Sequence, residues 1–277
     1  MEEMKQSMIK LGLLGERLTH SLSPKIHEQL FKQMKIQGEY KLYEVKEEAL
    51  PILLDNLKKE QLLGLNVTVP YKEKIMQYLD IVGKEAQEIG AVNTILIQDG
   101  RTYGANTDYI GVQQMFIRNH ISIEGKKITI LGSGGAAKAV VYACIKGGAE
   151  SICVVGRNTE QLHLFIERFP QIKICNYESI QRGQIIINTT PVGMYPHVGV
   201  SVVGTEVLTR FSIAIDIVYR PLETRFLQLA KESGATTITG LSMLVDQAIG
   251  SEEIWLKRKL DYRMGDDIIA LCRSNNV

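Results

Sequence analysis

Lys72 and Asp108 are the side chains of this chain best suited to move a proton. Lys72 ends the segment NVTVPYK, in which Pro70 breaks a strand, and we expect a helix to begin near Tyr71. The dipole of that helix disfavours a cation in its first turn, so the ammonium group would release its proton readily. Asp108 precedes a helix expected over 109–118, where a carboxylate is both a helix cap and a fixed chemical group. Lys72 is therefore a candidate for proton transfer and Asp108 for a chemical role, with a solvated lysine and a purely capping aspartate as the alternatives.

Two serines stand at an expected helix start, with Ser23 as the N-cap and Pro24 as the first helical residue. The first N–H groups of a helix are unsatisfied donors at its positive end, so the hydroxyls of Ser21 and Ser23 beside them suit a small carboxylate or phosphate. The simpler alternative is that Ser23 caps the helix and Ser21 is solvated. Asn66 and Thr68 alternate on the same face of a following strand, so they could present polar side chains to one ligand.

The stretch KITILGSGGAAKAV, from Lys127 to Val140, has the pattern of a strand, a tight turn and a helix start. Glycine lets the backbone adopt positive φ and approach a ligand closely, and the following helix start offers N–H donors. The pattern predicts the site of a dinucleotide pyrophosphate, with a plain glycine-rich turn as the alternative. The residues expected to cradle the pyrophosphate are Gly132, Ser133, Gly134, Gly135, Ala136 and Ala137.

The next expected strand ends at Gly156, Arg157 and Asn158. The acidic residue that would bind a ribose 2′-hydroxyl is absent there, and Arg157 stands in its place. An arginine favours the 2′-phosphate of NADP, although a solvated arginine is the alternative.

Strands and helices alternate strictly from Gly125 onward. This alternation predicts a doubly wound Rossmann domain whose parallel strands cover 127–131, 151–155, 172–175, 185–188 and 213–217. A long helix opens at Gly240 and places Met243 and Gln247 on one face, with a core role as the alternative for Met243. We predict an α/β protein with an N-terminal α/β substrate domain, 1–108 with 241–277, and a Rossmann domain, 109–240, the C-terminal helices packing back on the first domain.

The composition is that of a globular protein: of 277 residues, 45% are hydrophobic and 23% charged, and the formal net charge is +1. This balance gives no sign of a nucleic-acid or membrane partner, and no run approaches the ~20 apolar residues of a membrane span. Cys144, Cys153, Cys175 and Cys272 show no C-x-x-C spacing and are expected to be reduced core residues of a cytoplasmic protein. The histidines lack ligand spacing, so we expect no metal site.

A series of ordered motifs resembles one family, the shikimate dehydrogenases with their quinate/shikimate relatives. The motifs are HSLSP (20–24), NVTVPYK (66–72), GAVNT (90–94), NTD (106–108), GSGGAAKA (132–139), NTTPVGM (188–194), DIVYRPLET (216–224) and GLSMLVDQA (240–248). The resemblance implies NADPH-dependent, reversible reduction of 3-dehydroshikimate to shikimate, on the pathway to chorismate and the aromatic amino acids. Ketone reduction needs a hydride donor and a nearby proton donor, and Lys72 agrees with the second role.

The resemblance also implies roles for individual residues. Ser21 and Ser23 hold the substrate carboxylate, Tyr219 lies near it, and Lys72 is the acid/base partner of Asp108. The other residues that would contact the substrate are Asn66, Thr68, Asn93, Asp108 and Gln247. The residues that would contact NADP are those of the 132–137 loop together with Gly156, Arg157, Asn158, Ile217, Gly240 and Met243.

One departure from the family pattern concerns the dinucleotide. The family often has a second basic residue after the arginine, whereas here Arg157 is followed by Asn158, Thr159 and Glu160. Glu160 would repel a 2′-phosphate if it pointed inward, so NAD stays possible beside NADP. The alternatives are a quinate/shikimate dehydrogenase with NAD or dual cofactor use, and a non-catalytic dinucleotide-sensing regulator. The expected partner is a small-molecule substrate, and the chain is expected to be a monomer or homodimer.

Overall fold

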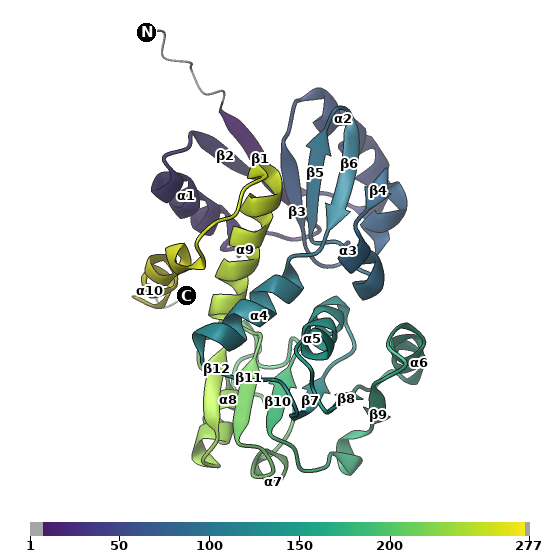
Figure 1. Ribbon diagram of the computed structural model, residues 1–277, viewed down its shortest axis with the longest axis vertical. Helices are drawn as coiled ribbons and strands as arrows, with labels where there is room; N and C mark the ends of the chain where they lie inside the picture. Colours follow the sequence, from purple (N-terminus) through teal and green to yellow (C-terminus); the bar gives the residue numbers. More distant parts are fainter. Residues whose placement is uncertain (1–7, 275–277) are drawn as a thin grey trace. The chain divides into compact units, whose positions relative to one another are not determined.

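A computed structural model describes residues 8–274 and divides them into two compact units, each with its own six-stranded sheet (Figure 1). The first unit comprises the chain up to Thr107 together with Ala248–Ile268. The second comprises Asp108–Gln247 together with the residues from Ile269. The prediction of an α/β fold is confirmed. Within residues 8–274, no helix is both long and apolar enough to cross a membrane.

The sheet of the first unit has the strand order β2-β1-β3-β5-β6-β4. Strand β1 is parallel to β2 and β3, whereas β5 is antiparallel to β3 and to β6. The hairpin between β5 and β6 turns at Asp99 and Gly100, which have φ of 52° and 74°, as a tight two-residue turn requires. The strands are β1 Ile9–Gly15, β2 Gly38–Glu44, β3 Gly64–Val67, β4 Ile81–Val82, β5 Thr94–Gln98 and β6 Arg101–Ala105.

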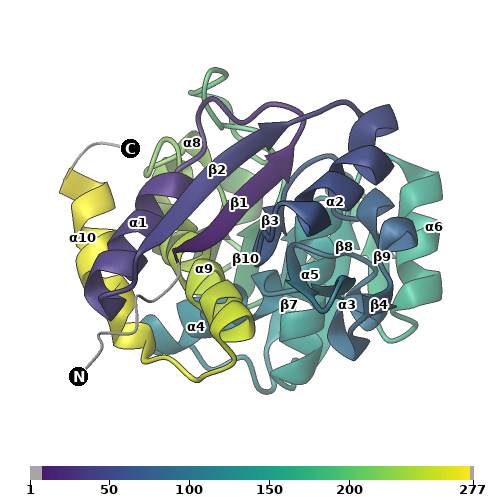
Figure 2. The same ribbon diagram turned by 90° about the horizontal axis from the view of Figure 1, so that it is seen from above.

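Helices cover this sheet and complete its core. Figure 2 shows β1 and β2 side by side with α1 along them. Leu11, Phe31 and Tyr40 from these elements pack with Trp255 of α9 in one apolar cluster. The helical elements of this part of the chain are α1 Ser23–Met34, η1 Glu47–Ala49, α2 Leu50–Lys59, η2 Lys74–Tyr78 and α3 Lys84–Ile89.

Two expected helix starts are wrong in detail. The residue before α1 is Leu22, and Ser23 is the first helical residue, because Ser21 rather than Ser23 accepts a capping bond from the backbone. No α-helix begins at Tyr71: Lys72 lies in a turn, and the short 3₁₀ helix η2 begins at Lys74. The helix-dipole argument for Lys72 therefore does not apply.

The sheet of the second unit is parallel throughout, in the order β12-β11-β10-β7-β8-β9. Read from β9, and with β7 counted as the first strand of the domain, this order is 3-2-1-4-5-6, that of a Rossmann sheet. The predicted Rossmann fold is confirmed. Ile186 and Ala214 of the sheet pack with Phe226 and Leu227 of α8 in its core. The strands are β7 Lys127–Leu131, β8 Ser151–Val155, β9 Lys173–Cys175, β10 Ile185–Asn188, β11 Ile213–Asp216 and β12 Thr236–Thr239.

The long helix α9 belongs to both units, because the boundary falls between Gln247 and Ala248. Its C-terminal half packs on the first unit, where the indole N–H of Trp255 donates to the carbonyl of Ile95 at 2.9 Å. This confirms that α9 returns to the N-terminal domain, whereas the residues of the last helix from Ile269 are grouped with the second unit. The remaining helical elements are α4 Asp108–Arg118, α5 Gly135–Lys146, α6 Thr159–Arg168, η3 Tyr177–Ser179, α7 Thr205–Leu208, α8 Arg225–Glu232, α9 Leu241–Leu256, η4 Tyr262–Met264 and α10 Gly265–Ser274.

The prediction of four reduced cysteines is wrong for two of them. Cys153 and Cys175 form a disulfide, with their Cα atoms 6.2 Å apart. They are 22 residues apart in sequence but lie on the neighbouring parallel strands β8 and β9, which bring their side chains together. Cys144 and Cys272 are buried thiols, and burial raises the pKa of Cys144 to about 12.

Candidate functional site

The carboxyl ends of β1 and β3 meet at one edge of the first sheet, because the two strands are parallel neighbours. A Cβ on Gly15 would lie 2.8 Å from Thr68 Cγ2 and 2.6 Å from Leu18 Cδ2, so the segments of Gly15, Leu18 and Thr68 pack closely at this edge. The next turn is closed by the bond from Ser21 N to Leu18 O at 2.9 Å. The predicted residues Ser21 and Thr68 thus follow strands that end at the same edge.

The two serines lie at the start of α1. The backbone N–H of Ser23 donates to Ser21 Oγ at 3.2 Å, which holds the Ser21 side chain against the first residue of the helix. Ser21 is partly exposed and Ser23 is buried. Hydroxyls and N–H groups at the positive end of a twelve-residue helix form an arrangement suited to a carboxylate.

Backbone bonds place Lys72 and Asn93 beside the end of β3. Val67 N donates to Asn93 O at 2.8 Å, and Val92 N donates to Lys72 O at 2.7 Å. Asn93 is 2% exposed, and its Oδ1 accepts from Thr107 N at 2.6 Å. The first unit therefore gathers Ser21, Ser23, Thr68, Lys72 and Asn93 on segments that leave one edge of its sheet.

Asp108 begins α4 directly after this edge and belongs to the second unit. Helix α4 packs closely on α9, since a Cβ on Gly111 would lie 2.5 Å from Met243 O and 3.1 Å from Gln247 N. Farther along the same two helices, Arg118 forms a bidentate ion pair with Asp246 at 2.8 Å for both bonds. These contacts fix the helix of Asp108 against the helix of Met243 and Gln247.

The glycine loop joins β7 to α5, and it lies next to the end of β10. Gly132 has φ of +114°, and a Cβ there would lie 2.6 Å from Thr189 Oγ1, so only glycine fits. A Cβ on Gly134 would meet no atom within 4 Å, which leaves room over the loop for a ligand. The strand order reverses between β7 and β10, the position at which Rossmann domains bind dinucleotides. Gly135, Ala136 and Ala137 form the first turn of α5.

The end of β8 lies beside this loop. A Cβ on Gly156 would be 3.3 Å from Ser133 Oγ, and Ser133 Oγ donates to Gln161 Oε1 at 3.1 Å. Asn158 caps α6 by accepting from Gln161 N at 3.0 Å. Arg157 is exposed, so its guanidinium is accessible to a phosphate.

The ends of β11 and β12 also approach each other closely. Gly240 contacts the carbonyl of Ile217 so tightly that no larger residue fits there. Tyr219 follows in the same loop, and burial raises the pKa of its hydroxyl. The predicted cofactor residues of the second unit thus lie on the carboxyl ends of β7, β8, β11 and β12 and on the helices that follow.

A polar cluster around Asp216 holds the loop after β10, and we did not predict it. The Asp216 carboxylate accepts from Thr224 Oγ1 at 2.6 Å and from Asn188 Nδ2 at 3.0 Å. Asn188 Oδ1 in turn accepts from Thr190 N at 3.0 Å. Burial raises the pKa of Asp216 to about 6, and these hydrogen bonds oppose the increase.

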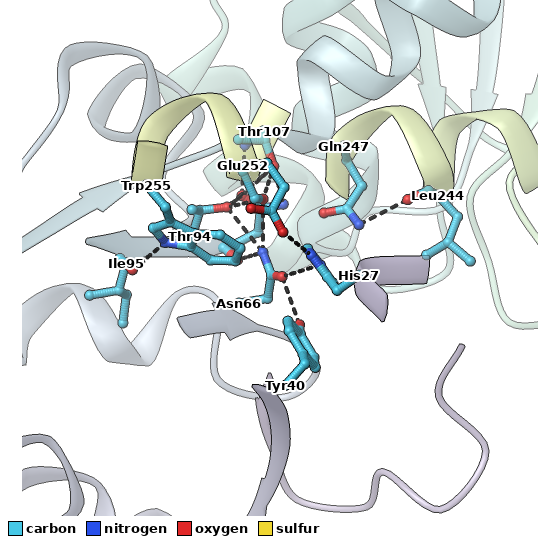
Figure 3. Close-up of polar contacts among 12 residues, drawn as sticks. His27, Tyr40, Asn66, Thr94, Ile95, Thr107, Leu244, Gln247, Glu252 and Trp255 are labelled. Carbon is cyan, nitrogen blue, oxygen red and sulfur yellow. Dashed lines mark hydrogen bonds and ion pairs between the residues drawn. The ribbon is translucent and has the colours of Figure 1, made fainter. Parts of the chain in front are cut away.

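A second unpredicted network occupies the interior of the first unit (Figure 3). His27 Nδ1 lies 2.7 Å from Glu252 Oε1, and its Nε2 lies 3.1 Å from Asn66 Oδ1. Both side chains of the His27–Glu252 pair are fully buried. Asn66, which we predicted to bind substrate, is only 4% exposed, and both ends of its amide contact protein groups.

Comparisons with known proteins agree with this division of the chain. The family model described as shikimate dehydrogenase substrate binding domain matches residues 13–95. The model described as NADP oxidoreductase coenzyme F420-dependent matches residues 127–218.

Similar full-length proteins cover almost the whole chain. A shikimate dehydrogenase (NADP(+)) of Clostridium beijerinckii is 44% identical over 94% of this chain and 96% of its own length. The crystal structure of shikimate dehydrogenase 1 from Peptoclostridium difficile has a TM-score of 0.87 and 42% identity, covering 98% of this chain and 100% of that one. The shikimate 5-dehydrogenase of Thermus thermophilus in complex with NADP(H) and shikimate has a TM-score of 0.88 and 33% identity, covering 95% and 99%.

Proposed function

Because the chain belongs to the shikimate dehydrogenase family, we propose that it catalyses the reversible, NADPH-dependent reduction of 3-dehydroshikimate to shikimate. The observation that carries the proposal is the sheet edge of the first unit. Strands that end together at this edge are followed by a helix start with two serine hydroxyls, and also by a threonine, a lysine and an asparagine. Such side chains suit a substrate that has a carboxylate, ring hydroxyls and a carbonyl that gains a proton.

The residues of the second unit fit NADP. The space over Gly134 and the N-terminus of α5 suit a pyrophosphate, and the exposed Arg157 suits a 2′-phosphate. Ser133, Gly156 and Asn158 line the neighbouring turn, and Ile217, Gly240 and Met243 are assigned to the nicotinamide end. When bound, NADPH supplies the hydride.

In this proposal the substrate is held and protonated by side chains of the chain itself. Ser21 and Ser23 bind the carboxylate, with Tyr219 near it. The side chains assigned to the hydroxyl groups are Thr68, Asn93, Asp108 and Gln247. Lys72 donates the proton to the carbonyl oxygen and stabilises the developing negative charge, and Asp108 is its acid/base partner.

We further propose that residues 1–108 with 241–277 form the substrate and catalytic domain and that 109–240 form the NADP domain. In this account the enzyme acts in the cytoplasm, on the route to chorismate and the aromatic amino acids, as a monomer or homodimer. A Cys153–Cys175 disulfide is unusual for a cytoplasmic protein, so its redox state in the purified protein bears directly on this location. Light scattering of the purified protein and mass spectrometry after thiol alkylation test the assembly and the redox state.

The proposed function is tested by following NADPH or NADH formation with shikimate or quinate as substrate and NADP or NAD as oxidant. We expect rapid oxidation only with shikimate and NADP. Comparable rates with quinate or with NAD would instead identify a quinate/shikimate dehydrogenase of relaxed cofactor use. Absence of turnover in all four combinations, together with tight dinucleotide binding, would identify a sensor.

A further inference from the structure

We propose that His27 and Glu252 are positioning residues for substrate binding, acting on Asn93 through the amide of Asn66 and on Ser23 along helix α1. The inference rests on the proposed function, since it takes Ser23 and Asn93 as substrate ligands. It also gives Asn66 an internal supporting role in place of a direct contact with substrate.

The hydrogen bonds around Asn66 determine which protons the network carries. The backbone carbonyl of Asn93 can only accept, so the Asn66 atom 3.2 Å from it is Nδ2, and Oδ1 faces His27 and Tyr40. Oδ1 can only accept, so His27 Nε2 carries a proton. One further proton lies between His27 Nδ1 and Glu252 Oε1, which are 2.7 Å apart. The pair is therefore neutral as a unit, whichever of the two groups holds that proton.

Burial agrees with a neutral pair. Glu252 Oε2 has no hydrogen-bond partner among the described residues and is fully buried, a costly arrangement for a lone carboxylate. The stacked Tyr40 ring lies 4.2 Å from the His27 ring. Burial raises the pKa of Tyr40 well above its usual value, so its hydroxyl remains a donor.

One arm of the network ends at the carboxylate-binding serines. Tyr40 OH donates to Asn66 Oδ1 at 2.7 Å, and its ring stacks on that of His27. Ser23 and His27 lie one turn apart on α1 and face the same interior. A change at His27 therefore reaches Ser23 through the helix.

The other arm ends at Asn93. Asn66 Nδ2 donates to Ser251 Oγ at 2.9 Å and contacts Thr94 Oγ1 at 3.3 Å. Thr94 Oγ1 donates to Asn93 Oδ1 at 3.0 Å, which fixes the amide that is expected to meet a ring hydroxyl. Both arms are buried throughout, so water cannot replace a missing member easily.

The decisive variant is His27→Phe, which keeps an aromatic ring against Tyr40 and removes both hydrogen bonds. Because two substrate ligands lose their orientation, we expect the KM for shikimate to rise about tenfold or more. The KM for NADP is set in the other unit and should stay within about twofold of wild type. Tyr40→Phe removes only the bond to Asn66 Oδ1 and keeps both bonds of His27, so it should give a smaller rise in the KM for shikimate.

Two further variants separate positioning from general stability. Glu252→Gln can donate to His27 Nδ1 and leave Nε2–H on Asn66, so its KM for shikimate should lie closer to wild type than that of His27→Phe. Trp255→Phe is the matched control, because it removes one buried bond of the same core, that to Ile95 O at 2.9 Å. It keeps an aromatic ring against His27 and leaves the hydrogen bonds of His27, Tyr40 and Asn66 intact. It should lower the melting temperature and leave the KM for shikimate unchanged.

The measurements are steady-state kinetics, thermal melts and the Kd of shikimate by calorimetry for all four variants. An unchanged KM and Kd for shikimate in His27→Phe and Tyr40→Phe, whatever their melting temperatures, would overturn the proposal. An equal rise in Trp255→Phe would also overturn it, since the effect would then be structural. If wild-type enzyme binds shikimate but does not oxidise it, the proposed function fails, while the Kd values still decide the positioning role.

Discussion

Loss of the ion pair between α4 and α9 should be among the most damaging single changes to the second unit. The Asp246 side chain is fully buried and that of Arg118 is 18% exposed. Both bonds are 2.8 Å long and share the planar geometry of a bidentate pair. Arg118→Met keeps the length of the side chain but leaves Asp246 without these bonds, a change that typically costs about 3–5 kcal/mol in the free energy of unfolding.

Urea unfolding followed by circular dichroism measures this loss. The matched control is Arg263→Met, because the pair of Arg263 with Asp261 is exposed and should contribute nothing measurable. The double variant R118M/D246L should recover part of the stability, since it removes the buried charge as well as its partner. A loss below about 1 kcal/mol for R118M, as for an exposed pair, would refute this account of how the two helices are held.

Three other changes test separate parts of the structure. Gly111→Ala should lower the free energy of unfolding by about 1–3 kcal/mol and raise the KM for shikimate, because the added Cβ would meet Met243 O. A variant as stable as wild type would show that α4 and α9 need no close approach. The pKa of Asp216 is raised to about 6, so the folded protein binds more protons than the unfolded chain between pH 4 and 6. The protonated Asp216 contributes to stability at low pH, and roughly 3 kcal/mol of the free energy of unfolding is lost as the pH rises through this range. Asp216→Asn should flatten the dependence of the melting temperature on pH between 4 and 6. An unaltered slope in the variant would contradict the raised pKa of Asp216. Arg157→Ala should raise the KM for NADP about tenfold with little effect on that for NAD, and an equal effect on both would exclude a contact with the 2′-phosphate.

Much of the fold could be predicted because the signals are local. The apolar strand before Gly132 and the alternation that follows predicted a parallel Rossmann sheet, and the structure confirms it. The hairpin of β5 and β6 depends on an equally local signal, the Asp99-Gly100 turn. Comparison with known proteins confirms the family, and the roles of individual residues stay predictions.

Local signals were also the source of the errors. Pro70 marked the end of a strand correctly, but it gave no sign that Lys72 would lie in a turn before a 3₁₀ helix. The hydroxyl of Ser23 looked like a cap, although Ser21 accepts the capping bond. Helix starts depend on the tertiary position of a few residues, which sequence patterns resolve only to within a turn.

The networks that hold the site are formed by residues far apart in sequence. His27 and Glu252 are 225 residues apart, and only the return of α9 to the first unit joins them. The cysteines of β8 and β9 illustrate the same limit, because strand adjacency decides their pairing. Gly111 did leave a signal: a glycine inside a helical pattern often marks a close approach.

Kinetics of Lys72→Ala with shikimate and NADP test the central claim most directly, with binding of NADP measured in parallel. The account predicts that kcat falls by about 100-fold or more because the proton donor is lost, while the Kd of NADP stays within about twofold of wild type. Unchanged turnover in Lys72→Ala would contradict the assignment of Lys72 and with it the proposed mechanism.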